Sequence, residues 1–322
     1  MLTFARPALA LLLAASLLAG CESREEKAER FYQSALQLLE QGDTDRALVE
    51  LRNVFDNDGL HKEARALYAK LQLERGDVQE AYGQLLRLVE QYPDDVEARL
   101  TLAEVAVGRG DWDEARRHGD EAVRLAPDEP RARAVGLALR YHDALVARDD
   151  SAREEVGREA RILLAQEPGL EIARRVVIDL LASGPTPADA LPEINKALEA
   201  EPGSLDLQVT KYRILAQSGD AEATGAQLRT MYERFPDNAE VRAALVGWYV
   251  SQGDDAGAEA LLRELAGDDA GEPGGHLAVV QFLQNAQGPA AAAAELDRLA
   301  AAHEGTPNAE LYRATRAGLD FE

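Results

Sequence analysis

The chain contains very little cysteine, few aromatic residues and far fewer basic than acidic residues. Cys21 is the only cysteine among 322 residues, so no disulfide can form within the chain and the folded part must be held together by packing. Aromatic residues make up 5% of the sequence and alanine is abundant, which favours closely packed helices over sheets of β-branched and aromatic residues. The formal net charge of −23 argues against binding to nucleic acid and against a polybasic contact with anionic lipid.

The sequence also lacks the motifs on which catalysis and cofactor binding commonly rest. It contains no His-Glu-x-x-His or Cys-x-x-Cys motif, no glycine-rich phosphate loop and no Gly-x-Ser-x-Gly elbow. The five histidines form no metal-ligand pair four positions apart. The nearest polar cluster is Tyr141-His142-Asp143, but adjacent residues point in different directions around a helix and do not converge. We therefore predict a protein without enzymatic activity, without a cofactor and without a bound metal.

The N-terminus has the pattern of an export signal. Arg6 precedes an apolar run from Ala8 to Leu18, which is shorter than the roughly 20 residues of a membrane span. The closing residues Leu18-Ala19-Gly20-Cys21 resemble the bacterial lipobox, which implies cleavage after Gly20 and acylation of Cys21. The alternative is an ordinary secretory signal with an accidental cysteine. We expect a signal peptide over residues 1–20, and then a lipidated cysteine with a short charged tether over residues 21–27.

A fixed period organises the rest of the chain. Gly42-Asp43, Gly76-Asp77 and Gly110-Asp111 follow one another at intervals of 34 residues, and Pro93 and Pro127 keep the same step. A 34-residue period with a helical pattern on both sides of a Gly-Asp turn resembles the tetratricopeptide repeat family. The resemblance implies an all-α fold, a right-handed α-solenoid of about eight helix-turn-helix repeats over residues 28–307. Residues 308–322 are predicted to form a closing helix, because a terminal repeat must present one face to water.

The repeats are least regular in the middle of the chain. Pro127 and Pro168 are 41 residues apart, and the seven extra residues predict a longer helix pair, 131–147 and 151–166, within an irregular repeat at 130–168. Further on, Pro192 conflicts with a straight helix starting at Pro187, so that helix is expected to begin later or to kink. Two other departures concern residues 267–275, which are either a hinge or a long loop, and Gly119, which stands where the family usually has a bulky residue.

The resemblance also implies a binding face, because the first helices of successive repeats line the surface that receives a peptide or protein in this family. The residues carried over to that face are Tyr32, Leu36, Glu63, Ala66, Lys70, Glu97, Leu100 and Glu104. The branch of the family that grips a carboxylate uses Lys, Asn and Arg there, whereas Tyr32, Leu36 and Glu97 would not attract one. The alternative is that such residues belong to the core at a slightly shifted register.

These observations predict a non-catalytic, lipid-anchored scaffold or assembly factor in the bacterial cell envelope. Its partners are expected to be envelope proteins or peptides, with the membrane contacted through the lipid alone and no nucleic acid bound. The predicted location is the periplasmic side of a bacterial membrane, with the outer membrane favoured over the inner. The alternative function is a subunit of an envelope enzyme or of an exopolysaccharide export complex. Direct polysaccharide binding would require exposed aromatic residues, and packing accounts equally well for the two tryptophans, Trp112 and Trp248.

Overall fold

The structure is a computed structural model that describes residues 22–267 and 272–319. In these residues every regular element is a helix, which confirms the predicted all-α class. None of the described helices combines the length and the hydropathy that a membrane crossing requires. The chain divides into two compact units, with the boundary between Ser183 and Gly184.

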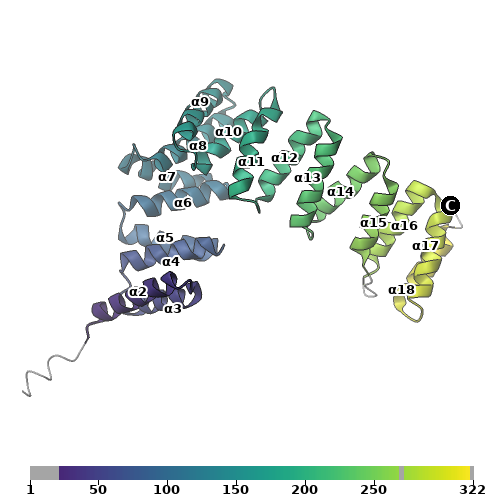
Figure 1. Cartoon of the computed structure of the whole chain (residues 1–322), viewed down its shortest axis with the longest axis horizontal. Helices are drawn as coiled ribbons and strands as arrows, with labels where there is room; N and C mark the ends of the chain where they lie inside the picture. Colours follow the sequence, from purple (N-terminus) through teal and green to yellow (C-terminus); the bar gives the residue numbers. More distant parts are fainter. Residues whose placement is uncertain (1–21, 268–271, 320–322) are drawn as a thin grey trace, which may run out of the picture. The chain divides into compact units, whose positions relative to one another are not determined.

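The first unit is a stack of helical hairpins. Helices α2 and α3, α4 and α5, and α6 and α7 form three antiparallel pairs that follow one another in chain order, as Figure 1 shows. The longer helices α8 and α9 come next and pack against α10. The helices of this unit are α2 (Arg24–Glu40), α3 (Thr44–Asn57), α4 (Lys62–Glu74), α5 (Val78–Gln91), α6 (Val96–Arg109), α7 (Trp112–Leu125), α8 (Pro130–Ala147), α9 (Asp150–Gln166) and α10 (Glu171–Ala182).

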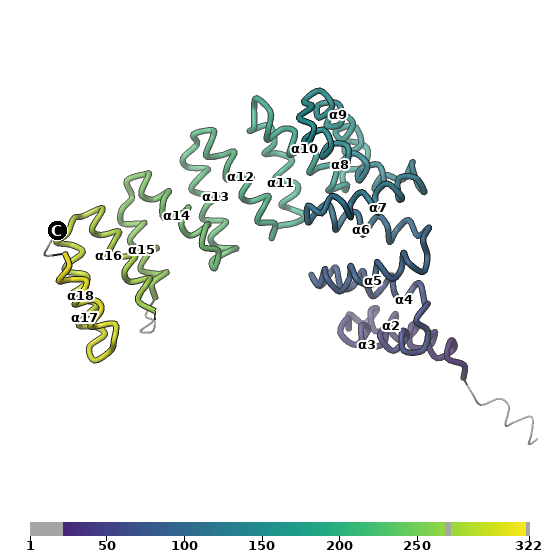
Figure 2. Tube along the Cα trace, turned by 180° about the vertical axis from the view of Figure 1, so that it is seen from behind, coloured from purple at the N-terminus to yellow at the C-terminus, as the bar shows by residue number. Residues whose placement is uncertain are grey.

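The second unit repeats the hairpin pattern from α12 onward (Figure 2). As Pro192 predicts, a short 3-10 helix at Pro187 precedes the α-helix, which begins only at Leu191. Near the C-terminus, α18 packs on α17 through the fully buried Tyr312. The helices of this unit are η1 (Pro187–Ala190), α11 (Leu191–Ala200), α12 (Leu205–Ser218), α13 (Ala221–Arg234), α14 (Ala239–Ser251), α15 (Asp255–Ala266), α16 (Gly274–Gln287), α17 (Pro289–Ala302) and α18 (Pro307–Leu319).

The Gly-Asp pairs form the turn inside each regular hairpin. In repeat three, Gly110 has a φ of 70°, in the left-handed region that glycine adopts without a side-chain penalty. The side chain of Asp111 then accepts a hydrogen bond from the Glu114 backbone N–H and caps α7. Arg148 and Asp149 take the same two places between α8 and α9, and Arg148 is the one non-glycine residue with positive φ in the described chain.

The irregular repeat has longer helices than the repeat before it. Helices α6 and α7 each have 14 residues, whereas α8 has 18 and α9 has 17. The turn and the following loop keep their lengths, so the seven extra residues lie entirely within the two helices, whose bounds lie within one residue of those predicted. Gly119 accommodates the longer α8, since a Cβ added there would lie 2.7 Å from Cγ1 of Val135.

An arginine near the start of several first helices braces the loop before it. The Arg65 guanidinium donates to the Gly59 carbonyl at 2.6 Å, and Arg99 donates to the Pro93 carbonyl at 2.7 Å. Arg174 makes the equivalent bond to Pro168. In each case the acceptor lies six residues before the arginine, so this contact fixes how the chain enters the repeat. Arg65 and Arg174 are buried, a role that sequence reasoning did not find.

The tether predicted over residues 21–27 is wrong from Arg24 onward. Ser23 accepts a hydrogen bond from the Glu26 backbone N–H, and the Glu26 side chain accepts one from the Ser23 N–H. This reciprocal capping box starts α2 at Arg24. Glu22 is also held, because Arg30 on the second turn donates two hydrogen bonds to its carboxylate. The solenoid therefore begins at Arg24, four residues before the predicted start.

Candidate functional site

The first helices of the opening repeats, α2 and α4, carry an accessible face of mixed polarity. We call it the α2–α4 face and define it by Glu29, Tyr32, Leu36, Glu63, Ala66 and Lys70. All of these except Glu29 are among the predicted binding residues. Glu29 was missed, although its distance of 34 residues from Glu63 is a signal that the repeat period contains. Five of the eight predicted residues thus lie on the first helices α2 and α4 and are half-buried or exposed.

Tyr32 of this face contacts His61, the residue that caps the start of α4. The rings of Tyr32 and His61 lie 4.8 Å apart between centroids, and Nε2 of His61 is 3.4 Å from Glu29 while Nδ1 is 3.5 Å from Glu63. Burial, followed by the negative charges of Glu63 and Glu29, raises the pKa of Tyr32. A hydrogen bond from Gln33, together with one from His61, outweighs partial burial and lowers the pKa of Glu29. Two carboxylates therefore border an aromatic pair.

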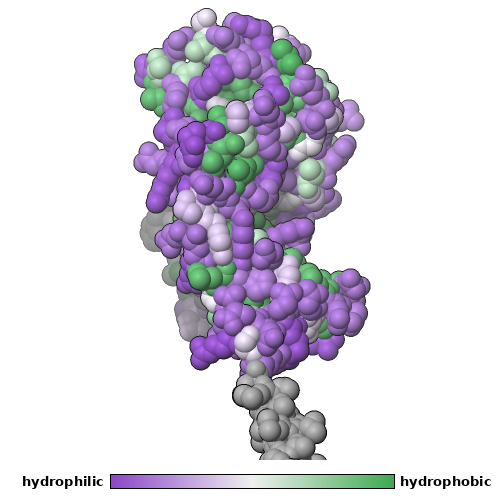
Figure 3. All heavy atoms as spheres, turned by 90° about the vertical axis from the view of Figure 1, so that its left-hand side faces the viewer, coloured by the Kyte–Doolittle hydropathy of each residue, from purple (hydrophilic) through white to green (hydrophobic). Residues whose placement is uncertain are grey.

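The other members of the face range from half-buried to exposed. Leu36 is half-buried, and Ala66 lies beside the core formed by α4, α5 and α6. Lys70 has 72% of its side chain exposed and is 3.9 Å from Glu74, a distance typical of a weak surface ion pair. Seen from the side of this unit, the surface is mostly hydrophilic with small separate apolar areas (Figure 3).

The predicted face does not extend onto α6 as expected. Leu100 is only 1% exposed, because α8 packs against α6 and encloses it with Ala132 and Val135. Leu100 as a binding residue is therefore wrong, and for this residue the alternative of a core position holds. The first two turns of α8 thus cover this position of α6.

Arg131 on α8 forms ion pairs with the two predicted glutamates of α6, Glu97 and Glu104. Its Nε and Nη2 donate to the two carboxylate oxygens of Glu104 at 2.8 and 2.7 Å, and Nη1 donates to Glu97 at 2.7 Å. The hydrogen bonding that Arg131 donates to Glu104 is the largest of the effects that raise the pKa of Arg131. Glu104 is thus engaged within the chain, whereas 72% of the Glu97 side chain remains exposed.

Both tryptophans contact neighbouring residues of the fold, and the side chains of the polar triplet do not converge, as predicted for adjacent positions on a helix. Trp112 stacks on His142 with centroids 4.0 Å apart, while Asp143 pairs with Arg116 and Tyr141 lies buried near Arg153. The three neighbours of the triplet thus face three different partners. In the second unit, Trp248 lies against Gly225, where an added Cβ would be 2.2 Å from the indole ring.

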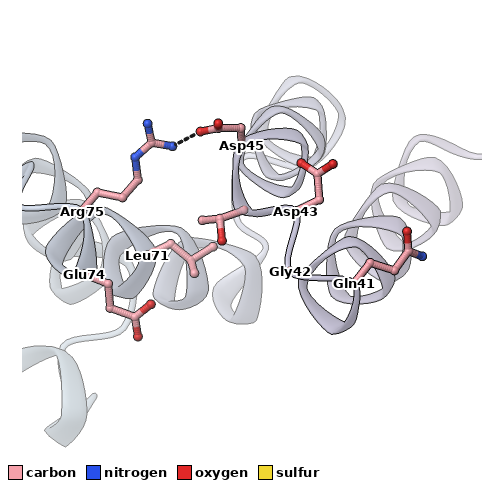
Figure 4. Close-up of a pocket in the computed structure, with 8 residues that line it drawn as sticks. Gln41, Gly42, Asp43, Asp45, Leu71, Glu74 and Arg75 are labelled. Atoms are coloured by element: carbon pink, nitrogen blue, oxygen red, sulfur yellow. Dashed lines mark hydrogen bonds and ion pairs between the residues drawn. The ribbon is translucent and has the colours of Figure 1, made fainter.

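Two hollows elsewhere on the described chain are open and polar. One of about 540 Å³ lies between the first Gly-Asp turn and the end of α4, and Arg75 crosses it to reach Asp45 at 2.5 Å (Figure 4). Another of about 440 Å³ in the second unit contains Glu295, bound by Arg263 and Arg298. No group of His, Cys, Asp and Glu side chains with the arrangement of a metal site occurs in the described residues. Cys21 and the lipobox residues Leu18, Ala19 and Gly20 lie outside those residues.

Comparison with protein families decides the identity of the fold. Family models of the tetratricopeptide repeat match residues 38–97 and 215–279, and a further tetratricopeptide repeat model matches residues 69–130. The chain is a tetratricopeptide repeat protein. The matched ranges include the Gly-Asp turns of repeats one to three and those at Gly219 and Gly253, so the resemblance based on the 34-residue period is confirmed. No curated protein sequence matches this tetratricopeptide repeat protein.

Several solved structures are similar to this tetratricopeptide repeat protein. A tetratricopeptide repeat protein from Parabacteroides merdae is 12% identical over 92% of this chain and 100% of that chain, with a TM-score of 0.33. PilF of Pseudomonas aeruginosa is 14% identical over 81% of this chain and 99% of its own, with a TM-score of 0.36. The Cut9–Hcn1 tetramer of the APC/C is 13% identical over 95% of this chain and 59% of its own, with a TM-score of 0.46. These low identities carry no information about partners.

Proposed function

We propose that this protein is a non-catalytic scaffold that holds other proteins of the bacterial envelope on its α2–α4 face. A lipid on Cys21 anchors it to the periplasmic side of a membrane, the outer membrane rather than the inner. The observation that carries the proposal is the α2–α4 face itself: Tyr32 and Leu36 are half-buried and stay partly accessible among charged side chains, whereas α8 encloses Leu100.

The capping of α2 supports a position close to the membrane. Two residues, Glu22 and Ser23, separate the proposed lipidated cysteine from the first helical residue. At about 3.3 to 3.6 Å per residue, the reach from Cys21 to Arg24 is roughly 10 Å. The first repeat, and with it the α2–α4 face, would lie near the headgroups, where membrane-associated partners are concentrated.

Fractionation of cells tests the anchor. The wild-type chain is expected in the membrane fraction after a high-salt wash, and Cys21→Ser is expected either in the soluble fraction or as the larger uncleaved precursor. A mature Cys21→Ser chain that stays on washed membranes as fully as the wild type contradicts lipid anchoring. Separation of inner from outer membranes then tests the location.

Site-specific photocrosslinking in intact cells tests the binding face. A crosslinking residue at Glu63 or Lys70 is expected to trap discrete protein adducts. The matched control positions are Glu90 on α5 and Asp120 on α7, which are exposed on second helices of the same unit and are expected to trap none. Adducts of equal yield from all four positions, or from none, would show that the α2–α4 face is not the binding site.

A further inference from the structure

We infer that the α2–α4 face takes a basic segment of its partner, with two arginine or lysine side chains about three residues apart. The inference rests on the proposed function, because it names the chemistry of the partner for the same face. It starts from the repeated carboxylates: Glu29, Glu63 and Glu97 stand 34 residues apart, with 56%, 66% and 72% of their side chains exposed.

The chain shows in its own fold what this row of carboxylates binds. Arg131 stands 34 residues after Glu97, at the next place in the same row. Its guanidinium satisfies Glu97 and Glu104 with N–O distances between 2.7 and 2.8 Å. A planar guanidinium matches a carboxylate in this way through two parallel hydrogen bonds. The α8 helix thus places a basic side chain against the carboxylates at the last position of this row.

At the preceding places in the row, no arginine or lysine of the described residues forms an ion pair with Glu29 or Glu63. His61 lies between Glu29 and Glu63, and its Nδ1 accepts the Ala64 backbone N–H at 3.3 Å, so the ring hydrogen is on Nε2 toward Glu29. The nearby Lys62 is engaged by Asp95 at 2.7 Å. Although Gln33 also donates to Glu29 at 2.8 Å, both carboxylate side chains remain more than half exposed. The net charge of −23 also disfavours a second copy of this chain as the occupant, because two such chains repel each other.

The position of His61 sets the pattern of the basic segment. Glu29 on α2 lies 3.4 Å from Nε2 of His61 and Glu63 on α4 lies 3.5 Å from its Nδ1, so the two carboxylates are separated at most by the imidazole ring and these two contacts, roughly 9 Å. An extended peptide rises about 3.3 Å per residue and covers this distance in three residues. Tyr32, which contacts the His61 ring between the two carboxylates, would meet the residues between the two cations. The matching segment is thus basic-x-x-basic with an apolar residue between the charges.

A binding assay with synthetic peptides tests this chemistry on the complete mature chain. The probe is a fluorescein-labelled twelve-residue peptide with arginine at every third position and alanine or serine between. One comparison peptide has glutamate in place of arginine, and another has the same composition with its arginines adjacent. Anisotropy is measured with wild type, with Glu29→Gln/Glu63→Gln, and with the matched control Glu90→Gln/Asp120→Asn, which removes the same charge from α5 and α7.

The spaced arginine peptide is expected to bind wild type and the control variant within about twofold of each other. Its affinity for Glu29→Gln/Glu63→Gln is expected to fall by more than that, up to roughly 30-fold, because two surface ion pairs are lost. Equal loss in both variants, or no loss in either, overturns the inference. Equal binding of the adjacent-arginine peptide overturns the spacing.

Crosslinking separates this inference from the proposed function. If Lys70 adducts form in intact cells with equal yield in wild type and in Glu29→Gln/Glu63→Gln, the face binds proteins but not through a basic segment. If wild type gives no adduct from Lys70, the proposed function itself fails. Loss of the same adducts in the double variant alone supports both.

Discussion

Arg131 and Glu104 form a two-pronged ion pair that joins the irregular repeat to the regular one before it. The Nε and Nη2 atoms of Arg131 donate to separate oxygens of Glu104 at 2.8 and 2.7 Å, across 27 positions of sequence. About 31% of the arginine side chain and 29% of the glutamate side chain are exposed. This contact, together with the packing of Leu100 against Ala132 and Val135, holds α8 on α6. The accessible surface of the α2–α4 face therefore does not continue onto α6.

A double-mutant cycle of Arg131→Gln and Glu104→Gln is expected to give a coupling free energy of about 1 to 2 kcal/mol, since the pair is bidentate and mostly buried. Urea unfolding of the four proteins measures it. The reference is the cycle for Arg124 and Glu121, an exposed pair on α7 that is expected to contribute about 0.5 kcal/mol or less. A coupling at Arg131 no larger than this reference would contradict a role in holding α8.

Arg148→Gly is expected to stabilise the first unit by about 1 kcal/mol. Arg148 has a φ of 56°, and the left-handed conformation costs a residue with a Cβ about 1 to 2 kcal/mol. Gly110→Ala is the reverse control: Gly110 has a φ of 70° at the equivalent place, with open space around its Cα, so the change is expected to destabilise by a similar amount. Denaturant midpoints of both variants provide the measurement. A midpoint of Arg148→Gly below wild type would show that its side chain contributes more than its backbone strain costs.

Gly225→Ala is expected to destabilise the second unit by about 1 to 3 kcal/mol, as overpacking commonly does. The added methyl would lie 2.2 Å from Cζ2 of Trp248, and a rigid indole cannot yield as a flexible side chain can. In a Trp112→Phe background the remaining tryptophan fluorescence reports on Trp248 alone. We expect a shifted emission maximum and a lower unfolding midpoint. Combining Gly225→Ala with Trp248→Leu is expected to recover part of the loss, and unchanged fluorescence would refute the close contact.

Stability of the second unit is expected to fall at acidic pH through Glu295. Burial alone would raise the pKa of this carboxyl, but hydrogen bonds from Arg298 and Arg263 and their charges outweigh burial and lower the pKa from 4.5 to about 2. A lowered pKa in the folded state means that the contribution is complete above about pH 4.5 and is lost as the pH falls toward 2.

Glu295→Gln therefore is expected to remove on the order of 3 kcal/mol at neutral pH, and to approach wild-type stability near pH 2. Urea unfolding from pH 7 to pH 2 measures the difference between the two proteins. Glu310→Gln is the control, because Glu310 forms an ion pair with Arg313 but keeps 75% of its side chain exposed. A difference between Glu295→Gln and wild type that stays constant with pH would contradict the lowered pKa.

The turns and helix pairs could be predicted because local chemistry determines them. A glycine that accepts positive φ and an aspartate that caps the next helix are needed at each hairpin, so Gly76-Asp77 and Gly110-Asp111 mark their turns wherever they occur. Even the irregular repeat could be located, since its seven surplus residues are visible as a change in the spacing of prolines.

The binding face was predicted only in part, because exposure depends on contacts between repeats. Leu100 has the same place in its repeat as Ala66 and Tyr32, yet α8 covers it and nothing in its own repeat indicates this. The start of α2 was missed for a different reason. Charged residues suggested a flexible tether, whereas Ser23 and Glu26 together satisfy the free N–H groups of a helix end.

The longer helices of the irregular repeat have a consequence for insertions and deletions in this chain. Four residues are added to α8 and three to α9, close to one turn in each, so neither apolar stripe is rotated far from its neighbours. The two helices of this hairpin are both lengthened by about one turn. The hairpin therefore extends at its tip, and the loops that join it to the neighbouring repeats keep their lengths. A single residue inserted between Gly59 and Arg65 could not be absorbed in this way, because it would lengthen the segment closed by the hydrogen bond from the Arg65 guanidinium to the Gly59 carbonyl. Natural variation in repeat length should therefore accumulate at the tips of hairpins rather than in the loops that join them.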